Sequence, residues 1–214
     1  MAVIVIGGHT RNIGKTSVVA GLISAMPEMR WTAIKITQHD HGVGSANGEQ
    51  CDCGTADHTV AISEEHDRTS RTDSSRYLTA GAAKSLWVRT RQGQLAQAMP
   101  LVRAEIARAE NVIVESNSIL RFLRPDVYAS VLDPAVADFK ASSLRYLDRA
   151  DALLLTSELH GPTEWRGVSM KLLEGIRRFE IHPPAYCSAE FVDFVAQRMG
   201  ESSVQFAASV IASK

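Results

Sequence analysis

The sequence predicts an α/β protein: a three-layer sandwich with a mainly parallel central sheet. Short runs of consecutive apolar residues recur along the chain, as expected of strands that are buried on both faces of a parallel sheet. Stretches with helical periodicity lie between several of these runs, and strands that alternate with helices form β-α-β units. With 214 residues and no break in composition, we expect a single domain over residues 1–214.

The expected strands and helices can be placed in chain order. The apolar runs predict strands at residues 2–6, 32–36, 85–88, 112–114, 127–132 and 152–155. Helical periodicity predicts helices over residues 15–26, 94–109 and 142–149. The tail "PAYCSAEFVDFVAQRMG" is expected to form a last strand, a helix cap at Ser188 and a closing helix, with a further helical stretch after Gly200.

One segment departs from this alternation. From Gln38 to about Arg71 the chain is polar, rich in Gly, His, Asp and Ser, and it has no sustained period. A structureless loop of that length is uncommon within a compact domain. The insertion at residues 38–71 is therefore expected to be either functional or disordered.

Charge and composition exclude several classes of partner. The formal net charge is -1, from 23 basic and 24 acidic residues, so we expect neither nucleic acid nor an anionic membrane as a partner. No apolar run reaches the roughly 18 residues of a membrane-spanning helix. The opening "MAVIVIGG" lacks the basic segment and cleavage site of a secretory signal, which predicts a cytoplasmic protein.

The glycine-rich stretch after the first strand is the strongest functional signal. A strand, a glycine-rich turn and a helix that opens with Lys15-Thr16 place backbone N-H groups and the positive end of a helix dipole around one point, which suits a phosphate chain. Lys15 would reach the β and γ phosphates, and the Thr16 hydroxyl would ligate Mg²⁺. The alternative is a chance match that opens an ordinary helix. The expected nucleotide-binding residues are Gly8, His9, Thr10, Arg11, Asn12, Ile13, Gly14, Lys15, Thr16 and Ser17.

Three charged residues near the ends of elements are candidates for the chemistry. Glu115 follows a buried strand, so its carboxylate should emerge at the carboxyl edge of the sheet, where it would hold a water of Mg²⁺; the alternative is a helix-capping or surface acid. Lys35 ends the second strand and would bind a phosphate or an anionic substrate, or else is merely exposed. Asp73 precedes an expected helix and would serve Mg²⁺ or the attacking group, unless it only starts that helix.

A second candidate site lies in the polar insertion. The pair His39 and His41, followed by Cys51 and Cys53, offers two imidazoles and two thiolates, a ligand set suited to tetrahedral Zn²⁺. His58 and His66 are substitutes for the histidines. The alternative is a mobile loop with solvated histidines and reduced thiols. The third cysteine, Cys187, lies among apolar residues and is expected in the core.

Several arginines flank this insertion. They would offer guanidinium groups to a phosphorylated ligand, or else form a solvated basic rim. These residues are Arg68, Arg71, Arg76, Arg89 and Arg91.

Four stretches of the sequence resemble known families. The spacing of Gly8 to Thr16, one residue longer than the usual G-x-x-x-x-G-K-[ST], resembles the loop of dethiobiotin synthetase and of the cobyrinic and cobyric acid synthases, which belong to the P-loop class shared with MinD-type ATPases and metal-insertion GTPases. The stretches "AIKITQHDHG", "TDSSRYLTAGAAKSLWVRT" and "NVIVESNS" resemble the molybdopterin-guanine dinucleotide biosynthesis adaptors of the MobB family. The positions that match that family are Lys35, His39, His41, Asp73, Arg76, Ala80, Gly81, Ala82 and Glu115.

The chain also departs from the adaptor pattern. That family has a shorter phosphate loop, and Ser116-Asn117 replaces the glycine that follows its glutamate. The insertion at residues 42–67 is a further difference.

The resemblance implies a Mg²⁺-dependent protein that binds GTP or ATP, hydrolyses it slowly and acts as an adaptor in molybdenum cofactor biosynthesis. Its catalytic residues would be Lys15, Lys35, Asp73 and Glu115. Its partner would be another protein of that pathway or a pterin phosphate, and it would be a homodimer. Two alternatives are an ATP-dependent ligase of the dethiobiotin synthetase type and a metal-delivery NTPase that uses the His and Cys cluster. No N-K-x-D element follows the strand at 152–155, so the base stays undecided.

Overall fold

The computed structural model of the chain describes residues 1–39, 60–157, 165 and 167–212, with side chains up to residue 200. Within these residues, eight strands form one sheet in the order β3-β4-β2-β5-β1-β6-β7-β8. Every neighbouring pair is parallel except β3 and β4, which are antiparallel. The strands are β1 Val3–Gly8, β2 Trp31–His39, β3 Val60–Glu64, β4 Lys84–Arg91, β5 Asn111–Glu115, β6 Val127–Leu132, β7 Ala152–Leu155 and β8 Arg177–Glu180.

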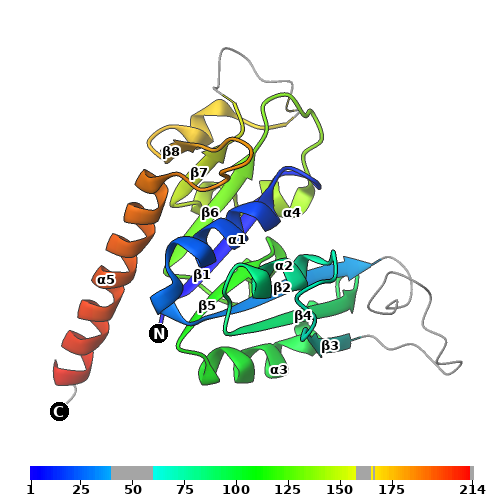
Figure 1. Cartoon of the computed structure of the whole chain (residues 1–214). Coiled ribbons are helices and arrows are strands. Elements are labelled where there is room, and N and C mark those ends of the chain that lie inside the picture. The colour runs from blue at the N-terminus through cyan, green and yellow to red at the C-terminus, as the bar shows by residue number, and fades with distance from the viewer. Residues whose placement is uncertain (40–59, 158–164, 166, 213–214) are drawn as a thin grey trace, which may run out of the picture.

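Helices cover both faces of the sheet, which confirms the predicted α/β sandwich (Figure 1). Side chains of α1, α2 and the first half of α5 pack on one face, and side chains of α3 pack on the other. The helices are α1 Lys15–Ala25, α2 Asp73–Thr79, α3 Leu95–Arg108, α4 Ala141–Leu144 and α5 Ala189–Ala212. Short 3-10 turns occupy η1 Pro27–Met29, η2 Ser118–Arg121, η3 Leu147–Arg149 and η4 Met170–Leu173.

The central strand β1 explains why its sequence is an unbroken apolar run. Ile4 and Ile6 pack in the core beneath α1, whereas Val5 packs in the core beneath α3, and all three are fully buried. A strand with a core on each face has no position for a polar side chain. Because β1 lies in the middle of the sheet, the loop that follows it emerges at the centre of the carboxyl edge.

Two strands differ from the expectation. Strand β3 lies inside the insertion at residues 38–71, where no regular structure was expected, because it is a short edge strand with only partly buried residues. The last strand is β8, not the segment "PAYC", which is irregular. In β8 only Phe179 is buried, so this edge strand has no apolar run that marks it in the sequence.

Two helical segments also differ from the prediction. The helix expected at residues 142–149 is a short α4 followed by η3. The closing helix and the stretch after Gly200 form one continuous helix, α5, and the Ser188 hydroxyl accepts a hydrogen bond from the Phe191 N-H at 3.3 Å, as expected of its cap. Among the described helices, none combines the length and the apolar composition that crossing a bilayer requires.

Candidate functional site

The loop between β1 and α1 leaves the start of the helix open to a ligand. Gly14 precedes the helix with a left-handed φ of 92°, and Asn12 is also left-handed, with φ 59°. No side chain caps the first turn of α1. The backbone N-H groups of that turn therefore have no side-chain acceptor, and they point where an anion would satisfy them.

Asn117 fastens the beginning of this loop. Its Oδ1 accepts a hydrogen bond from the Gly8 N-H at 3.0 Å, and its Nδ2 donates to the Gly8 carbonyl at 2.9 Å. A Cβ on Gly7 would lie 2.1 Å from Asn117 Oδ1, so only glycine allows this approach. The sequence showed Asn117 only as a replacement for a family glycine. This role could not be predicted, because its partner, Gly8, is far away in the sequence.

His9 holds a neighbouring segment in place. Its side chain is fully buried, and its Nδ1-H donates to the Asp138 carbonyl at 2.7 Å while its Nε2 accepts from the Asp133 N-H at 3.0 Å. These two bonds fix the neutral tautomer. Burial outweighs the nearby carboxylates and lowers the pKa of His9 below its usual value. His9 therefore joins the phosphate loop to the segment after β6.

Because the neutral form of His9 is required, the folded protein should lose stability in acid. The unfolded chain takes up this proton near pH 6.5 and the folded chain only at lower pH, so stability is complete above pH 6.5 and falls below it. We expect urea denaturation of His9→Gln to lose part of this dependence, which amounts to at most about 1.4 kcal/mol per pH unit for one proton. The exposed His182→Gln is the matched control, and an unchanged profile in His9→Gln would contradict this role.

Lys15 is folded back onto its own loop. Its ammonium donates to the Thr10 carbonyl at 2.5 Å. Burial lowers the pKa of Lys15 to about 8, because Glu115 offsets only part of the cost of removing the charge from water. A buried ammonium that lacks a full counter-charge is poised to gain one from a phosphate.

The same burial predicts that Lys15 weakens the nucleotide-free fold. Below pH 8 the Lys15 ammonium is charged in both states, but burial makes this charge less favourable in the folded protein than in the unfolded chain. This loss in the free energy of unfolding disappears as the pH rises toward 10.5. Lys15→Met should therefore raise the free energy of unfolding at pH 7 by about 1–3 kcal/mol. Urea denaturation tests this, with the exposed Lys171→Met as control. A variant less stable than the parent would contradict it.

A network of charges lies beside the loop, where Glu115 at the end of β5 faces Lys35 of β2. Lys35 lies within β2 and does not end it as expected, because this strand continues to His39. Glu115 is 5% exposed and accepts hydrogen bonds from Thr16 Oγ1 at 2.8 Å, from Lys35 Nζ at 2.8 Å and from the Tyr77 hydroxyl. Lys35 Nζ also donates to Asp73 Oδ2 at 2.5 Å. The structure thus brings together four residues that the sequence proposed separately, and adds Tyr77.

The network explains how these buried charges are tolerated. Burial alone would lower the pKa of Lys35, but Glu115 and Asp73 outweigh it and raise that pKa. Burial and the Glu115 carboxylate raise the pKa of Tyr77 well above its ordinary value, so its hydroxyl stays a donor. The side chain of Asp73 is 39% exposed, which leaves this carboxylate accessible from the solvent side.

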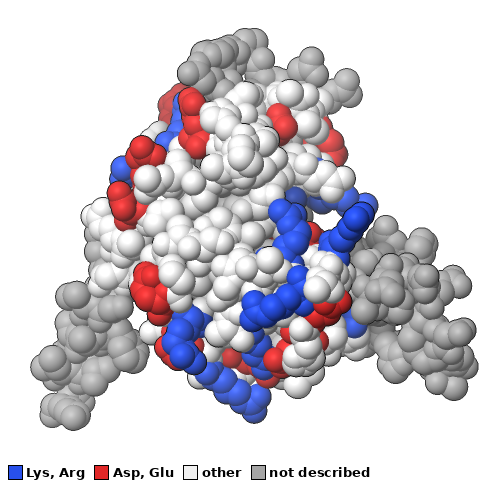
Figure 2. Space-filling model, viewed as in Figure 1, with Lys and Arg blue, Asp and Glu red and all other residues white. Residues whose placement is uncertain are grey.

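A cavity of about 890 Å³ joins the loop and the network. Of the ten residues expected to bind nucleotide, seven line it, whereas the side chains of His9, Thr10 and Ile13 do not. Lysine and arginine side chains gather on the face over the ends of α1 and α2 (Figure 2). The charged residues that line the cavity are Arg11, Lys15, Lys35, Arg76, Lys140, Asp73 and Glu115.

The donor set beside the loop suits magnesium. Oxygens of Thr16, Glu115 and Asp73 already converge on one cation, the ammonium of Lys35, which lies 3.5 Å from Thr16 Oγ1. Hard oxygen ligands, a hydroxyl and one or two carboxylates, are those that Mg²⁺ uses together with substrate phosphates. The residues present therefore fit this ion.

The expected zinc cluster is only partly described. His39 ends β2, and its Nε2 lies 3.1 Å from Thr37 Oγ1. Three of the proposed ligands, His41, Cys51 and Cys53, lie outside the described residues, as does the substitute His58. Within the described part of the chain, no group of three or more His, Cys, Asp or Glu side chains could hold a metal ion.

Of the remaining candidates described next, Arg76 lines the cavity and the others do not. Arg76 lines the cavity and donates to Ser17 Oγ at 2.8 Å. Arg68 instead donates to the Leu78 carbonyl, and Arg89 stacks on Trp87 at 4.5 Å from the ring centre. Cys187 packs against the core, as expected, and burial raises the pKa of its thiol to about 12.

Comparisons with known proteins find structural matches of low similarity among solved structures. No family model matches the chain, and no curated protein matches its sequence. HypB from Helicobacter pylori in complex with nickel aligns over 93% of this chain and 87% of its own, with 14% identity and a TM-score of 0.49. LpxK from Aquifex aeolicus in complex with ATP aligns over 84% of this chain, with 18% identity and a TM-score of 0.48, and this chain spans 53% of it. MobB from Bacillus subtilis aligns over 92% of this chain and 98% of its own, with 15% identity and a TM-score of 0.39.

The chain's own geometry indicates its class. A central parallel strand, β1, leads through a glycine-rich turn into α1, with Lys15 and Thr16 at the start of the helix and Glu115 on β5, the neighbouring strand in the sheet. This is the arrangement that a phosphate loop requires. The chain has the architecture of a P-loop protein.

Proposed function

We propose that this protein binds a purine nucleoside triphosphate together with Mg²⁺ and hydrolyses it slowly or uses it as a switch. One observation carries the proposal: the hydrogen bond from Thr16 Oγ1 to Glu115 Oε2, at 2.8 Å, beside an uncapped helix start and the buried Lys15 ammonium. These groups would meet a phosphate chain and its cation from three sides.

The residues at the loop would bind the phosphates, the metal ion or the attacking group. Lys15 would leave the Thr10 carbonyl and bind the β and γ phosphates. Thr16, Glu115 and Asp73 would hold Mg²⁺, which supplies neutralisation of the charge on the phosphate oxygens. Lys35 would hold both carboxylates in place through its hydrogen bonds to Asp73 and Glu115. Asp73, the more exposed carboxylate, is the candidate to orient the attacking group.

Calorimetric titration tests this proposal. Mg²⁺ with a non-hydrolysable ATP or GTP analogue should bind with a stoichiometry of one, and omission of Mg²⁺ should weaken that binding. Thr16→Val should lose the Mg²⁺ dependence, whereas Ser169→Val, at an exposed serine that precedes η4, should keep it. If the parent protein binds neither analogue, the proposal is wrong.

The depressed pKa of Lys15 adds a pH-dependent signature. Nucleotide favours the ammonium form, so binding near pH 8 should take up about half a proton, and binding at pH 7 nearly none. Above pH 8 the affinity should fall, to roughly a tenth at pH 9. Titration in buffers of different ionisation enthalpy measures the uptake. Equal proton uptake at pH 7 and pH 8 would be inconsistent with this role.

The cellular role that we propose follows from the sequence resemblance. The motifs around Lys35, Asp73 and Glu115 support an adaptor, a homodimer, in molybdenum cofactor biosynthesis, with a pathway protein or a pterin phosphate as its partner. A ligase of the dethiobiotin synthetase type is less well supported, because a carboxylate substrate would compete with Asp73 and Glu115 for Lys35. Turnover that rises sharply with one small carboxylic acid would favour the ligase.

A further inference from the structure

The cavity continues past the phosphate loop to an aromatic side chain. Tyr186, between β8 and α5, lines the same cavity as Lys15 and Thr16. Its ring covers Gly14, where an added Cβ would lie 2.5 Å from Tyr186 Cε1 and 2.7 Å from Cδ1. Tyr186 thus stands at the start of α1.

The network beside the loop fixes the direction in which a nucleotide would lie. Glu115 and Lys35 come from β5 and β2, which lie on one side of β1, whereas β6, β7 and β8 lie on the other side. Lys15 and the magnesium ligands take the β and γ phosphates, so the terminal phosphate belongs on the side of β5. The ribose and base then extend toward β6, β7 and β8.

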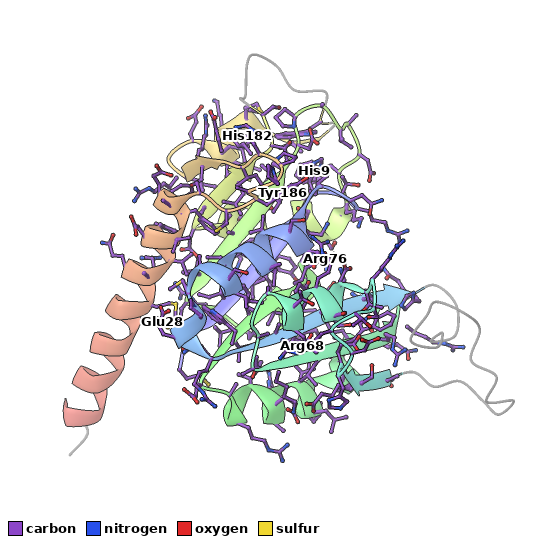
Figure 3. The ribbon with its side chains drawn as sticks, in the orientation of Figure 1. His9, Glu28, Arg68, Arg76, His182 and Tyr186 are labelled. Carbon is purple, nitrogen blue, oxygen red and sulfur yellow. The ribbon has the colours of Figure 1, made fainter. Side chains whose placement is uncertain are left out.

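Tyr186 lies on that side. In Figure 3, Tyr186 and Arg76 approach the start of α1 from opposite sides, Tyr186 from the segment after β8 and Arg76 from α2. We propose that Tyr186 is the platform on which the purine base stacks, and that it supports ATP and GTP equally. This inference rests on the proposed function, because it presumes triphosphate binding at the loop.

A platform for a base must be rigid, and the two residues that follow Tyr186 are both held in place. The next residue, Cys187, packs against Gly21 of α1, where an added Cβ would lie 2.8 Å from Cys187 Cβ. Ser188 then caps α5. The ring itself is half-buried and packs against the core beneath α1. A fixed aromatic face in a polar cavity offers a base an apolar surface that the charged residues around it do not.

Stacking through a π-face does not distinguish the two purines. Every base has such a face, and the removal of one base-aromatic contact typically weakens binding by about 5- to 100-fold. Tyr186 should therefore contribute the same factor to the affinity for ATP and for GTP. Inorganic tripolyphosphate, which lacks a base, should gain nothing from it.

The experiment compares nucleotides with tripolyphosphate in the full chain. Titrations with Mg²⁺ and non-hydrolysable ATP, non-hydrolysable GTP or tripolyphosphate are carried out on the parent protein, Tyr186→Phe and Tyr186→Leu. Leucine keeps an apolar cover over Gly14 but removes the aromatic face. We expect Tyr186→Leu to bind both nucleotides about 10-fold more weakly and tripolyphosphate as the parent does, and Tyr186→Phe to match the parent throughout.

The outcomes separate this inference from the function on which it rests. If Tyr186→Leu binds nucleotides like the parent, Tyr186 is not the base platform. The same conclusion follows if the substitution weakens the binding of tripolyphosphate by the same factor as the binding of nucleotides. If the parent binds neither nucleotide nor tripolyphosphate, the proposed function itself fails. Should Tyr186→Leu not fold, a nuclear Overhauser effect between the base H8 proton and the Tyr186 ring in the parent protein decides; its presence supports the inference and its absence overturns it.

Discussion

Lys15→Ala is expected to weaken the binding of Mg²⁺ with ATP or GTP by roughly 100-fold or more. The buried ammonium would face the phosphate chain in the complex, and truncation of one partner of a buried charge pair costs about 2–5 kcal/mol. The fluorescence of a labelled nucleotide, displaced by unlabelled ATP or GTP, measures the affinity. The exposed Lys171→Ala should bind like the parent.

This result separates a phosphate loop from a chance match to its motif. In an ordinary helix start, Lys15 would contribute only its hydrogen bond to the Thr10 carbonyl, and its loss would leave nucleotide affinity unchanged. A folded Lys15→Ala protein with the parent's affinity for both nucleotides would therefore contradict the account.

Glu115→Ala is expected to lower the free energy of unfolding by about 3–5 kcal/mol, the largest change in stability that we expect at the site. The substitution leaves the Lys35 ammonium without its buried partner and the Tyr77 hydroxyl without its acceptor. Asp73→Ala removes the more exposed partner of the same lysine and should cost less than about 1 kcal/mol. Urea denaturation at pH 7 compares the two.

A double substitution tests whether the unpaired charge causes this loss. If it does, Glu115→Leu should be rescued in part by Lys35→Met, because an apolar pair avoids the buried charge. Equal losses in Glu115→Ala and Asp73→Ala, or no rescue, would show that Glu115 is not the centre of the network.

The sequence predicted the fold where burial leaves a clear pattern. Strand β1 has a core on both faces, so every residue from Val3 to Ile6 is apolar, whereas β3 and β8 are edge strands in which few residues are buried. An edge strand with a single buried residue has no periodicity to detect. The same reason explains why the last strand was expected in the segment "PAYC".

The sequence predicted the charged residues of the candidate site but not the other side chains that position or line it. The sequence placed Lys35 and Glu115 at the same carboxyl edge of the sheet, so their proximity could be expected, although β2 continues beyond Lys35 to His39. Asn117, Tyr77 and Tyr186 could not be placed, because each reaches the site through packing between elements far apart in the chain. His9 is the converse case, since its motif suggested a ligand contact and its side chain is buried in the fold.

The central claim is that backbone amides at the start of α1 and the Lys15 ammonium enclose a magnesium-bound triphosphate. The most direct test records ¹H-¹⁵N spectra of the labelled protein during titration with Mg²⁺ and a non-hydrolysable ATP or GTP analogue. We expect the amides of Gly14, Lys15 and Thr16 to show the largest shifts, downfield as they donate to phosphate oxygens. Saturation by either analogue with those three amides unmoved would contradict the claim.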